Sequence, residues 1–283
     1  TDVMKLKFIE EKAMKVVMLV TTLLVFLFVG SILYTIVKNG WGAMNWEMIS
    51  SLPGGGFYIG KEGGLLNAIV GSLYIVGAST VLGLAVSIPV VFYLNIYLKK
   101  NSKRGSFARL AYDVLFGIPS IVYGAFAFTI MIYLGLKTSL AGGIIVITLL
   151  IIPIFIRSMD EIARELPQDM LNASYSLGAT RYETIKVVVR QIAPGIATAT
   201  LLSIGRAIGD AAAVLFTAGY TDNIPTSLGQ PAATLAVFFQ LSSPIPAVQE
   251  RAYAAALILT IIVLILSILG RIITNRFSRN KIQ

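Results

Sequence analysis

The sequence contains neither cysteine nor histidine, and charged residues make up only 13% of its 283 positions. Without cysteine there is no disulfide and no thiolate metal site, and without histidine the commonest general base and metal ligand are missing. The Gly-x-x-x-x-Gly-Lys-Ser/Thr pattern of a phosphate-binding loop is also absent, so we do not expect the chain to bind ATP itself. Its apolar segments carry no paired carboxylates either. We therefore expect no metal, no cofactor and no catalytic residues, which argues against an enzyme.

Apolar sequence is abundant instead, because hydrophobic residues make up 56% of the chain. Several runs of about twenty residues carry almost no charge, which is the length that crosses a hydrocarbon core roughly 30 Å thick. A soluble protein would expose too much of this surface to water, so the sequence predicts an all-α polytopic membrane protein. The six predicted transmembrane helices cover residues 16–37, 67–98, 110–136, 140–156, 194–220 and 252–273.

Lysine and arginine are sorted by connection along the chain. They are frequent before the first span, in 99–109, in 157–190 and after the last span, and scarce in the remaining connections. Cytoplasmic loops carry this excess of positive charge, so both termini and the 157–190 segment are predicted to lie in the cytoplasm. The net charge of +9 then reflects topology in a multi-pass protein of the cytoplasmic (inner) membrane. It predicts no nucleic-acid partner, and membrane lipid is the expected surrounding.

The cytoplasmic segment 157–190 is predicted to form a helical hairpin. Its apolar residues recur at three- and four-residue steps, which is the helical period. A proline is tolerated in a first turn, so we expect a break near Leu166 and a new helix from Pro167. Gly178 suits a left-handed C-cap. Thr180 and Glu183 form a Thr-x-x-Glu capping box that starts the next helix.

The fifth span, 194–220, carries charged residues inside an apolar segment. On one continuous helix, Ser203, Arg206, Asp210 and Thr217 would share a face, and the two charges, four residues apart, would pair. Charges at membrane depth must face protein or water. One interpretation is mutual neutralisation within the helix bundle. The other is that Arg206 lines a path for an anion, because its planar guanidinium matches an oxyanion, while Asp210 orients it and limits how tightly it holds the ion.

Three further features concern the packing of the apolar segments. Pro119 either is tolerated in its span or bends it beside a pathway. The apolar piece 232–241 is too short to span, so it is re-entrant, interfacial or partner-facing, or it packs on its own protein. Gly205 and Gly209 form a small-xxx-small step that permits a close helix contact.

Several segments resemble the permease subunits of ABC importers. The general resemblance is to their cytoplasmic EAA loop, and the narrower one is to phosphate-specific subunits, closer to the PstA type than to its PstC-type partner. It covers residues from about 63 to 273. The segments are 117–124 (Gly-Ile-Pro-Ser-Ile-Val-Tyr-Gly), 172–178 (Asn-Ala-Ser-x-x-x-Gly), 176–181 (Ser-Leu-Gly-Ala-Thr-Arg), 206–212 (Arg-Ala-Ile-Gly-Asp-Ala-Ala) and 215–219 (Leu-Phe-Thr-Ala-Gly).

The resemblance implies that the hairpin docks on an ATP-binding subunit. Here the family's glutamate is replaced by Asn172 and its second alanine by Ser174. Asn172 cannot form an ion pair, so Asp169 or Glu183 is the candidate to supply that charge. The residues expected to couple to the ATPase are Asn172, Ala173, Ser174, Gly178, Ala179, Thr180, Arg181, Tyr182 and Glu183.

The implied architecture is the MetI-like fold of type I ABC importer permeases, with six transmembrane helices. Residues 1–62 would supply the cytoplasmic N-terminus, the peripheral first helix and an outer loop. Residues 63–275 would form a core of five helices with the coupling hairpin at 157–190, and 276–283 a cytoplasmic tail.

The implied function is that of a permease subunit in an ATP-driven importer of inorganic phosphate, with ATP hydrolysis on a partner subunit. The expected partners are ATP-binding cassette subunits, a homologous PstC-type permease and an extracytoplasmic phosphate-binding protein. Two alternatives remain open. One is an ABC permease for another oxyanion, such as sulfate, molybdate or phosphonate. The other is a channel or carrier that needs no ATP.

Overall fold

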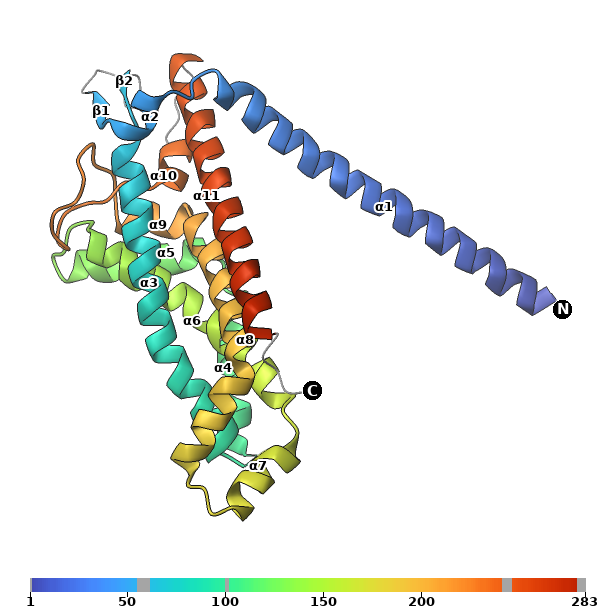
Figure 1. The fold of residues 1–283 in the computed structure, drawn as a ribbon. Helices are drawn as coiled ribbons and strands as arrows, with labels where there is room; N and C mark the ends of the chain where they lie inside the picture. Colours follow the sequence, from blue (N-terminus) through green and yellow to red (C-terminus); the bar gives the residue numbers. More distant parts are fainter. Residues whose placement is uncertain (1, 55–61, 100–101, 241–245, 279–283) are drawn as a thin grey trace.

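The computed structural model describes residues 2–54, 62–99, 102–240 and 246–278, and these are almost entirely helical (Figure 1). The small exception is a two-residue antiparallel ladder in which Pro53 pairs with Gly63. In chain order the elements are α1 (Asp2–Trp41), α2 (Trp46–Ser50), β1 (Pro53–Gly54), β2 (Glu62–Gly63), α3 (Leu66–Phe92), the π-helix η1 (Tyr93–Tyr97), α4 (Lys103–Gly117), α5 (Ser120–Tyr133), α6 (Leu140–Arg164), α7 (Gln168–Ser176), α8 (Arg181–Ile208), α9 (Ala212–Thr217), α10 (Leu235–Gln240) and α11 (Pro246–Ser278).

Among the described residues, five helices are long and apolar enough to cross a membrane, and the bent pair α4–α5 makes up to six. This agrees with the predicted number of spans. The five cover Glu10–Trp41, Leu66–Tyr97, Leu140–Arg164, Arg181–Ile208 and Val248–Ile272. Two of them run on into the predicted hairpin, because α6 continues past residue 156 and α8 begins before residue 194. The second hairpin arm is therefore continuous with its membrane helix α8, whereas the first arm is interrupted between α6 and α7.

The bend between α4 and α5 is a sharp one. The two helices meet at 95°, so the predicted span 110–136 is not straight. Ile118 is extended, with φ −72° and ψ 128°, as expected for a residue that precedes a proline. Pro119 then starts α5. Across the break, the Tyr123 hydroxyl donates to the Leu115 carbonyl at 2.9 Å, which also accepts the Ile118 N–H at 3.2 Å.

The core is built around α3 and α6, which run side by side (Figure 1). Gly83 of α3 has no side chain, and the ring of Phe155 from α6 fills that space. Ser79 donates to the Ile144 carbonyl at 3.0 Å, so a polar contact helps to set the register of the two helices. Helix α8 packs against α6 and α11 and completes the bundle that holds the candidate site.

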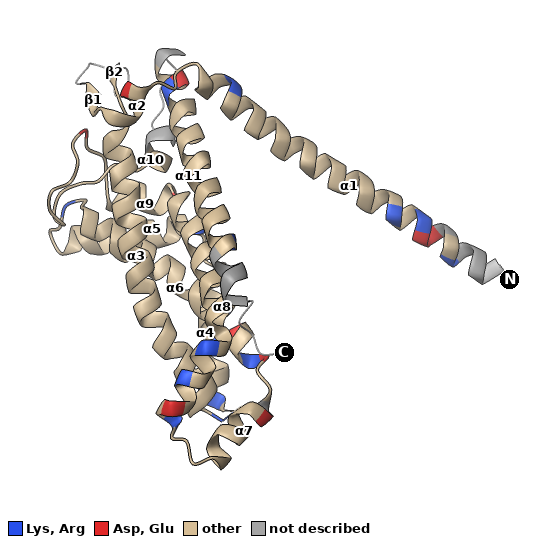
Figure 2. Cartoon of the chain, in the orientation of Figure 1, with Lys and Arg blue, Asp and Glu red and all other residues tan. Residues whose placement is uncertain are grey.

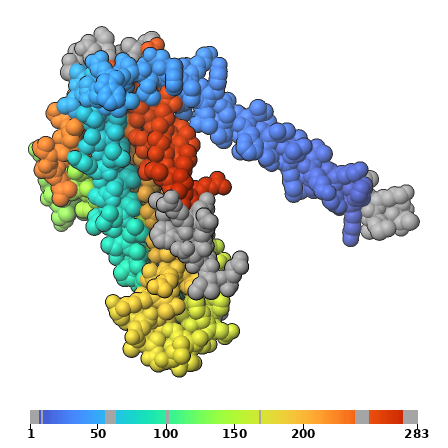
Figure 3. Space-filling view, in the orientation of Figure 1, coloured from blue at the N-terminus to red at the C-terminus, as the bar shows by residue number. Residues whose placement is uncertain are grey.

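Helix α1 lies largely outside this bundle. Its most apolar stretch has none of its residues buried, and the helix diverges from the column formed by the other elements (Figure 3). Contact with α11 occurs near the end of α1, where Gly40 lies against the Tyr253 carbonyl. The arrangement matches the expected peripheral first helix.

Part of the apolar piece 232–241 packs on its own protein. Ala232, Ala233 and Leu235 are buried, and the Leu235 N–H donates to Ser72 Oγ on α3 at 3.0 Å. Residue 241 lies outside the described residues, as do residues 279–283 of the predicted tail.

At the end of the molecule away from α10, Lys and Arg gather around α7 (Figure 2). This is the end that the sequence assigns to the cytoplasm.

Candidate functional site

The predicted fifth span is interrupted at its charged residues. Helix α8 passes through Pro194 and ends at Ile208, and α9 follows after a break. In that break, Asp210 Oδ1 accepts a hydrogen bond from the Ala213 N–H at 2.9 Å. A bond from the N–H three residues on is the pattern of a capping side chain, although the backbone cap position of α9 is one residue further, at Ala211. The bond competes with continuation of the preceding helix. The prediction of one helix over 194–220 was therefore wrong.

The predicted polar face is divided by this break. Ser203 and Thr217 are fully buried. Thr217 Oγ1 donates to the Ala213 carbonyl at 2.8 Å, and Ser203 Oγ has no hydrogen-bond partner within the described part of the chain. The predicted ion pair is present, since Arg206 Nη2 lies 3.7 Å from Asp210 Oδ2, with side chains 51% and 2% exposed. Only Arg206 of the four predicted path residues is open to the surroundings.

One face of α8 around Arg206 is left uncovered by this chain. Thr198, Leu202, Gly205, Arg206 and Gly209 are all exposed along it. A Cβ added at Gly205 would meet nothing within 4 Å. Gly209 lines an apolar cavity of about 670 Å³ between the α8–α9 break, α1 and α11. The close helix contact predicted at the two glycines is therefore absent among the described residues.

The hairpin follows the predicted local rules. Pro167 directly precedes α7, and Gly178 has φ +83°, the left-handed conformation that glycine adopts without strain. Thr180 Oγ1 accepts from the Glu183 N–H at 3.3 Å, and the Glu183 carboxylate accepts from the Thr180 N–H at 2.8 Å. This reciprocal capping box starts α8.

The hairpin tip presents apolar surface. Leu177 is 89% exposed and Tyr182 65% exposed. The Ser174 and Thr184 hydroxyls lie 3.1 Å apart and join α7 to α8. Sequence reasoning counted Leu177 only as part of the helical period, because a pattern of spacing does not show which apolar residue remains uncovered. The predicted coupling residues that are exposed are Asn172, Ala173, Gly178, Thr180, Arg181, Tyr182 and Glu183, whereas Ser174 and Ala179 are half-buried.

A family model described as "Binding-protein-dependent transport system inner membrane component" matches residues 83–282. The match takes in both the hairpin and the break at Asp210. The chain belongs to this family of permeases.

Several relatives and solved structures are similar to this permease. It is 34% identical to the phosphate transport system permease protein PstA of Pasteurella multocida over 85% of this chain and 86% of that protein. It is 36% identical to PstA of Yersinia pestis over 75% of this chain and 72% of that protein. The MetNI methionine ABC transporter shares the fold at TM-score 0.63 and 18% identity, covering 75% of this chain and 95% of that chain. A bacterial alginate ABC transporter shares the fold at TM-score 0.69 and 12% identity, covering 98% of this chain and 99% of that chain.

Sequence reasoning missed a buried charged cluster near the hairpin end of this permease. Asp160 of α6 accepts from Asn95 Nδ2 at 2.7 Å, Arg109 Nε at 2.8 Å, Arg109 Nη2 at 3.1 Å and Tyr112 Oη at 2.7 Å. The Asp160 side chain is 1% exposed. An acidic residue in the continuation of an apolar helix was the available signal, but its three partners lie 48 to 65 residues away. We call these four residues the Asp160 cluster.

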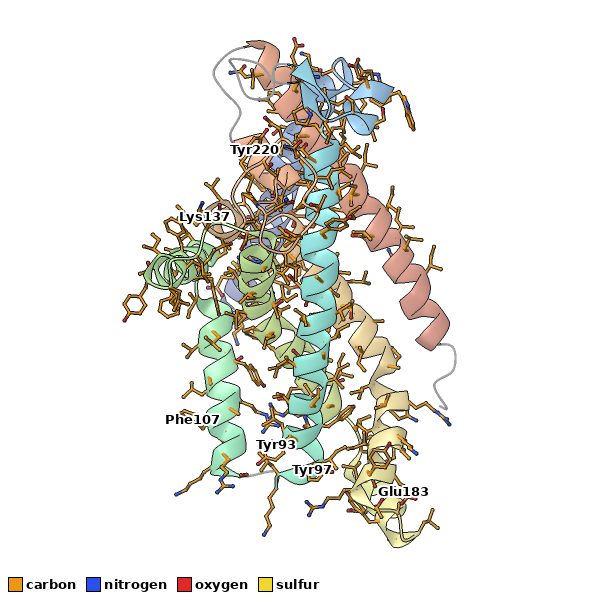
Figure 4. The ribbon with its side chains drawn as sticks, turned by 90° about the vertical axis from the view of Figure 1, so that its left-hand side faces the viewer. Tyr93, Tyr97, Phe107, Lys137, Glu183 and Tyr220 are labelled. Carbon is orange, nitrogen blue, oxygen red and sulfur yellow. The ribbon has the colours of Figure 1, made fainter. Side chains whose placement is uncertain are left out.

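The first residue of α8 also contacts the permease core. The Arg181 guanidinium lies 5.4 Å from the centre of the Tyr97 ring on η1, within the range of a cation–π interaction. Tyr97 stacks on Tyr93 with ring centres 6.3 Å apart. Figure 4 shows these two tyrosines at the same end of the molecule as Glu183 on the hairpin. Arg181 is thus directed at η1 while remaining exposed.

The far end of the permease holds a cavity of about 570 Å³, lined by Leu52 and by the connection between α9 and α10. Tyr220 lies in that connection and is half-buried (Figure 4).

Proposed function

We propose that this permease forms one half of a path for inorganic phosphate across the cytoplasmic membrane. A homologous PstC-type permease supplies the other half. ATP-binding cassette subunits supply the energy, and an extracytoplasmic phosphate-binding protein delivers the ion. The PstA relatives support the choice of phosphate. The observation that carries the proposal is the position of Arg206. It is half-exposed on a face of α8 that this chain leaves open, and it is paired with the buried carboxylate of Asp210.

The geometry of Arg206 suits an ion that must be held and then released. A guanidinium is always charged and offers a planar fork of N–H donors to an oxyanion. Asp210 lies 3.7 Å away, which is longer than a hydrogen bond. The carboxylate therefore attracts Arg206 without occupying its donors, and the same attraction limits how tightly Arg206 holds phosphate. The second permease covers the open face of α8.

The hairpin end of the molecule receives the motor subunit. The excess of Lys and Arg predicts that this end and both termini lie in the cytoplasm. Leu177 and Tyr182 are large and exposed there. Such residues are typical anchors of a protein interface. Closure of the ATP-binding subunits moves the hairpins, and because α8 continues without interruption from Arg181 to Ile208, the motion reaches the turn that carries Arg206. The phosphate-binding protein meets the opposite end.

The test is uptake by the reconstituted complex carrying Arg206→Gln, with Arg206→Lys as the charge-preserving comparison. We expect the glutamine variant to assemble with its partners and to lose phosphate uptake at least 100-fold, because a neutral side chain does not attract an anion. The lysine variant should retain part of the uptake, since it keeps the charge but not the fork. Normal uptake by the glutamine variant would refute the role of Arg206.

The same vesicles separate the alternatives. Competition by sulfate, molybdate or phosphonate at concentrations equal to phosphate would identify another oxyanion as the substrate. Uptake that persists without ATP or without the ATP-binding subunits would identify a channel or carrier. We expect neither result, because the PstA relatives favour phosphate among the oxyanions and the family consists of permeases that work with binding proteins.

A further inference from the structure

The π-helix η1 makes contacts in two directions at the hairpin end of α3. Asn95 lies in its middle and donates to Asp160 on α6. Tyr97 is its last residue and faces Arg181, the first residue of α8. A π-helical turn is wider than an α-helical one and is frequently found at functional sites. In this permease it brings the core and the second arm of the hairpin into contact with one short segment.

On the core side, the Asp160 cluster joins three helical elements through one carboxylate. Oδ1 accepts from Asn95 and Arg109, and Oδ2 accepts from Arg109 and Tyr112. These donors come from η1 and α4, and the acceptor belongs to α6. Apolar side chains of similar volume would hold the helices together at least as well. A fully hydrogen-bonded buried charge additionally imposes one relative position on its partners.

On the hairpin side, the contact is aromatic and cationic. Tyr93, Tyr97 and Ile185 of α8 line a shared groove of about 500 Å³. Arg181 lies over the Tyr97 ring, so the start of α8 cannot shift freely past η1. Helix α7 contacts α8, its Leu171 packs against the buried core, and the helix is interrupted between α6 and α7. Motion of α7 therefore reaches the core through α8 and its neighbour η1, as well as through Leu171.

We infer that Tyr97 and the Asp160 cluster are positioning residues for transport. They make the ends of α3, α4 and α6 follow the start of α8 as one body when the motor subunits close. This inference rests on the proposed coupling of the hairpin to ATP hydrolysis. It adds a second route for that motion, through η1 into α4 and α6, beside the direct route along α8. Loss of this route leaves ATP hydrolysis intact but lowers the phosphate moved per ATP.

The first experiment measures ATP hydrolysis and phosphate uptake together in proteoliposomes that contain the whole complex. We expect Tyr97→Leu to lower the ratio of phosphate to ATP at least threefold with an unchanged half-saturation concentration for phosphate. Tyr97→Phe keeps the ring face for Arg181 and should restore most of the ratio. Tyr112→Phe removes a single hydrogen bond to Asp160 and should lower the ratio less. Tyr133→Leu is the matched control, because Tyr133 is 89% exposed at the far end of α5.

A double variant tests whether the two contacts belong to one route. If they do, Tyr97→Leu with Tyr112→Phe loses no more coupling than Tyr97→Leu alone, whereas independent defects multiply. An unchanged ratio in both single variants, a multiplied loss, or a change confined to the half-saturation concentration would each overturn the inference. If Tyr97→Leu does not assemble, Tyr112→Phe decides by the same ratio. Failure of the proposed function would instead appear in the unaltered complex as absent ATP-dependent phosphate uptake.

A distance measurement tests the rigid body directly. This chain has no cysteine, so Lys103→Cys on α4 and Lys186→Cys on α8 can be spin-labelled in a complex whose partner chains are free of cysteine. We expect the distance between the labels to be the same in nucleotide-free and ATP-bound complexes. In the Tyr97→Leu background it should differ between the two states. A distance that already changes with nucleotide when Tyr97 is present would contradict the inference.

Discussion

Exchanging Asp210 for asparagine separates the two roles of this buried carboxylate. An asparagine oxygen can still accept the Ala213 N–H bond that starts α9, because asparagine is as good an N-cap as aspartate. It cannot attract Arg206, because it carries no charge. Asp210→Ala removes both roles and is the matched comparison.

The expected magnitudes follow from the geometry. Loss of a capping side chain costs about 1 kcal/mol of stability. At the 3.7 Å separation of Arg206 and Asp210, the Coulomb attraction is roughly 4 kcal/mol at an effective dielectric constant of about 20. Because the Arg206 side chain is 51% exposed, solvent screens this to about 1 kcal/mol. An Arg206 freed of that attraction should therefore hold phosphate about fivefold more tightly.

The assay combines thermal unfolding of the purified complex with uptake kinetics in proteoliposomes. Asp210→Asn should be more stable than Asp210→Ala by about 1 kcal/mol, which is the contribution of the cap. Its half-saturation concentration for phosphate should fall, and its maximal rate should fall as well, because release becomes slower. Equal stability of the two variants would refute the capping role. Unchanged uptake kinetics in both would refute the idea that Asp210 tunes Arg206.

Two further predictions concern the hairpin. Leu177→Asp should reduce co-purification of the ATP-binding subunit at least tenfold, because it places a charge at the exposed apolar tip. The control is the same change at Leu136, which is 57% exposed near the other end of the permease. Equal losses in the two variants would contradict the docking role. Gly178→Ala should lower the free energy of unfolding by about 1 kcal/mol in thermal denaturation, because alanine is strained at φ +83°; an unaltered melting temperature would show that the turn relaxes.

Much of the hairpin could be predicted because its bonds are local. The capping box joins residues three apart, and the left-handed turn at Gly178 depends on that residue alone. The number of spans could be predicted for a related reason, since the length and polarity of each segment are properties of the segment itself. The peripheral place of the first helix came from the resemblance to ABC importer permeases.

The candidate path was only partly predictable, because the same residues allow two local structures. Arg206 and Asp210 pair at a spacing of four whether the helix continues or ends. A helix with a polar face and a helix broken by a capping Asp210 have the same sequence pattern. Burial of Ser203 and Thr217 depends on the neighbouring helices, which the pattern of one segment does not contain.

The sequence by itself determined the membrane class, the sorting of positive charge and the turns of the hairpin, because each depends on which residues make up a segment or a turn and not on how the helices pack. Only the tertiary structure decided which charges meet at a distance. Asp160 binds Asn95 across 65 residues of chain, and Arg181 reaches Tyr97 on another helix. Such contacts depend on how whole helices pack, and nothing in the spacing of residues along one helix specifies its neighbour.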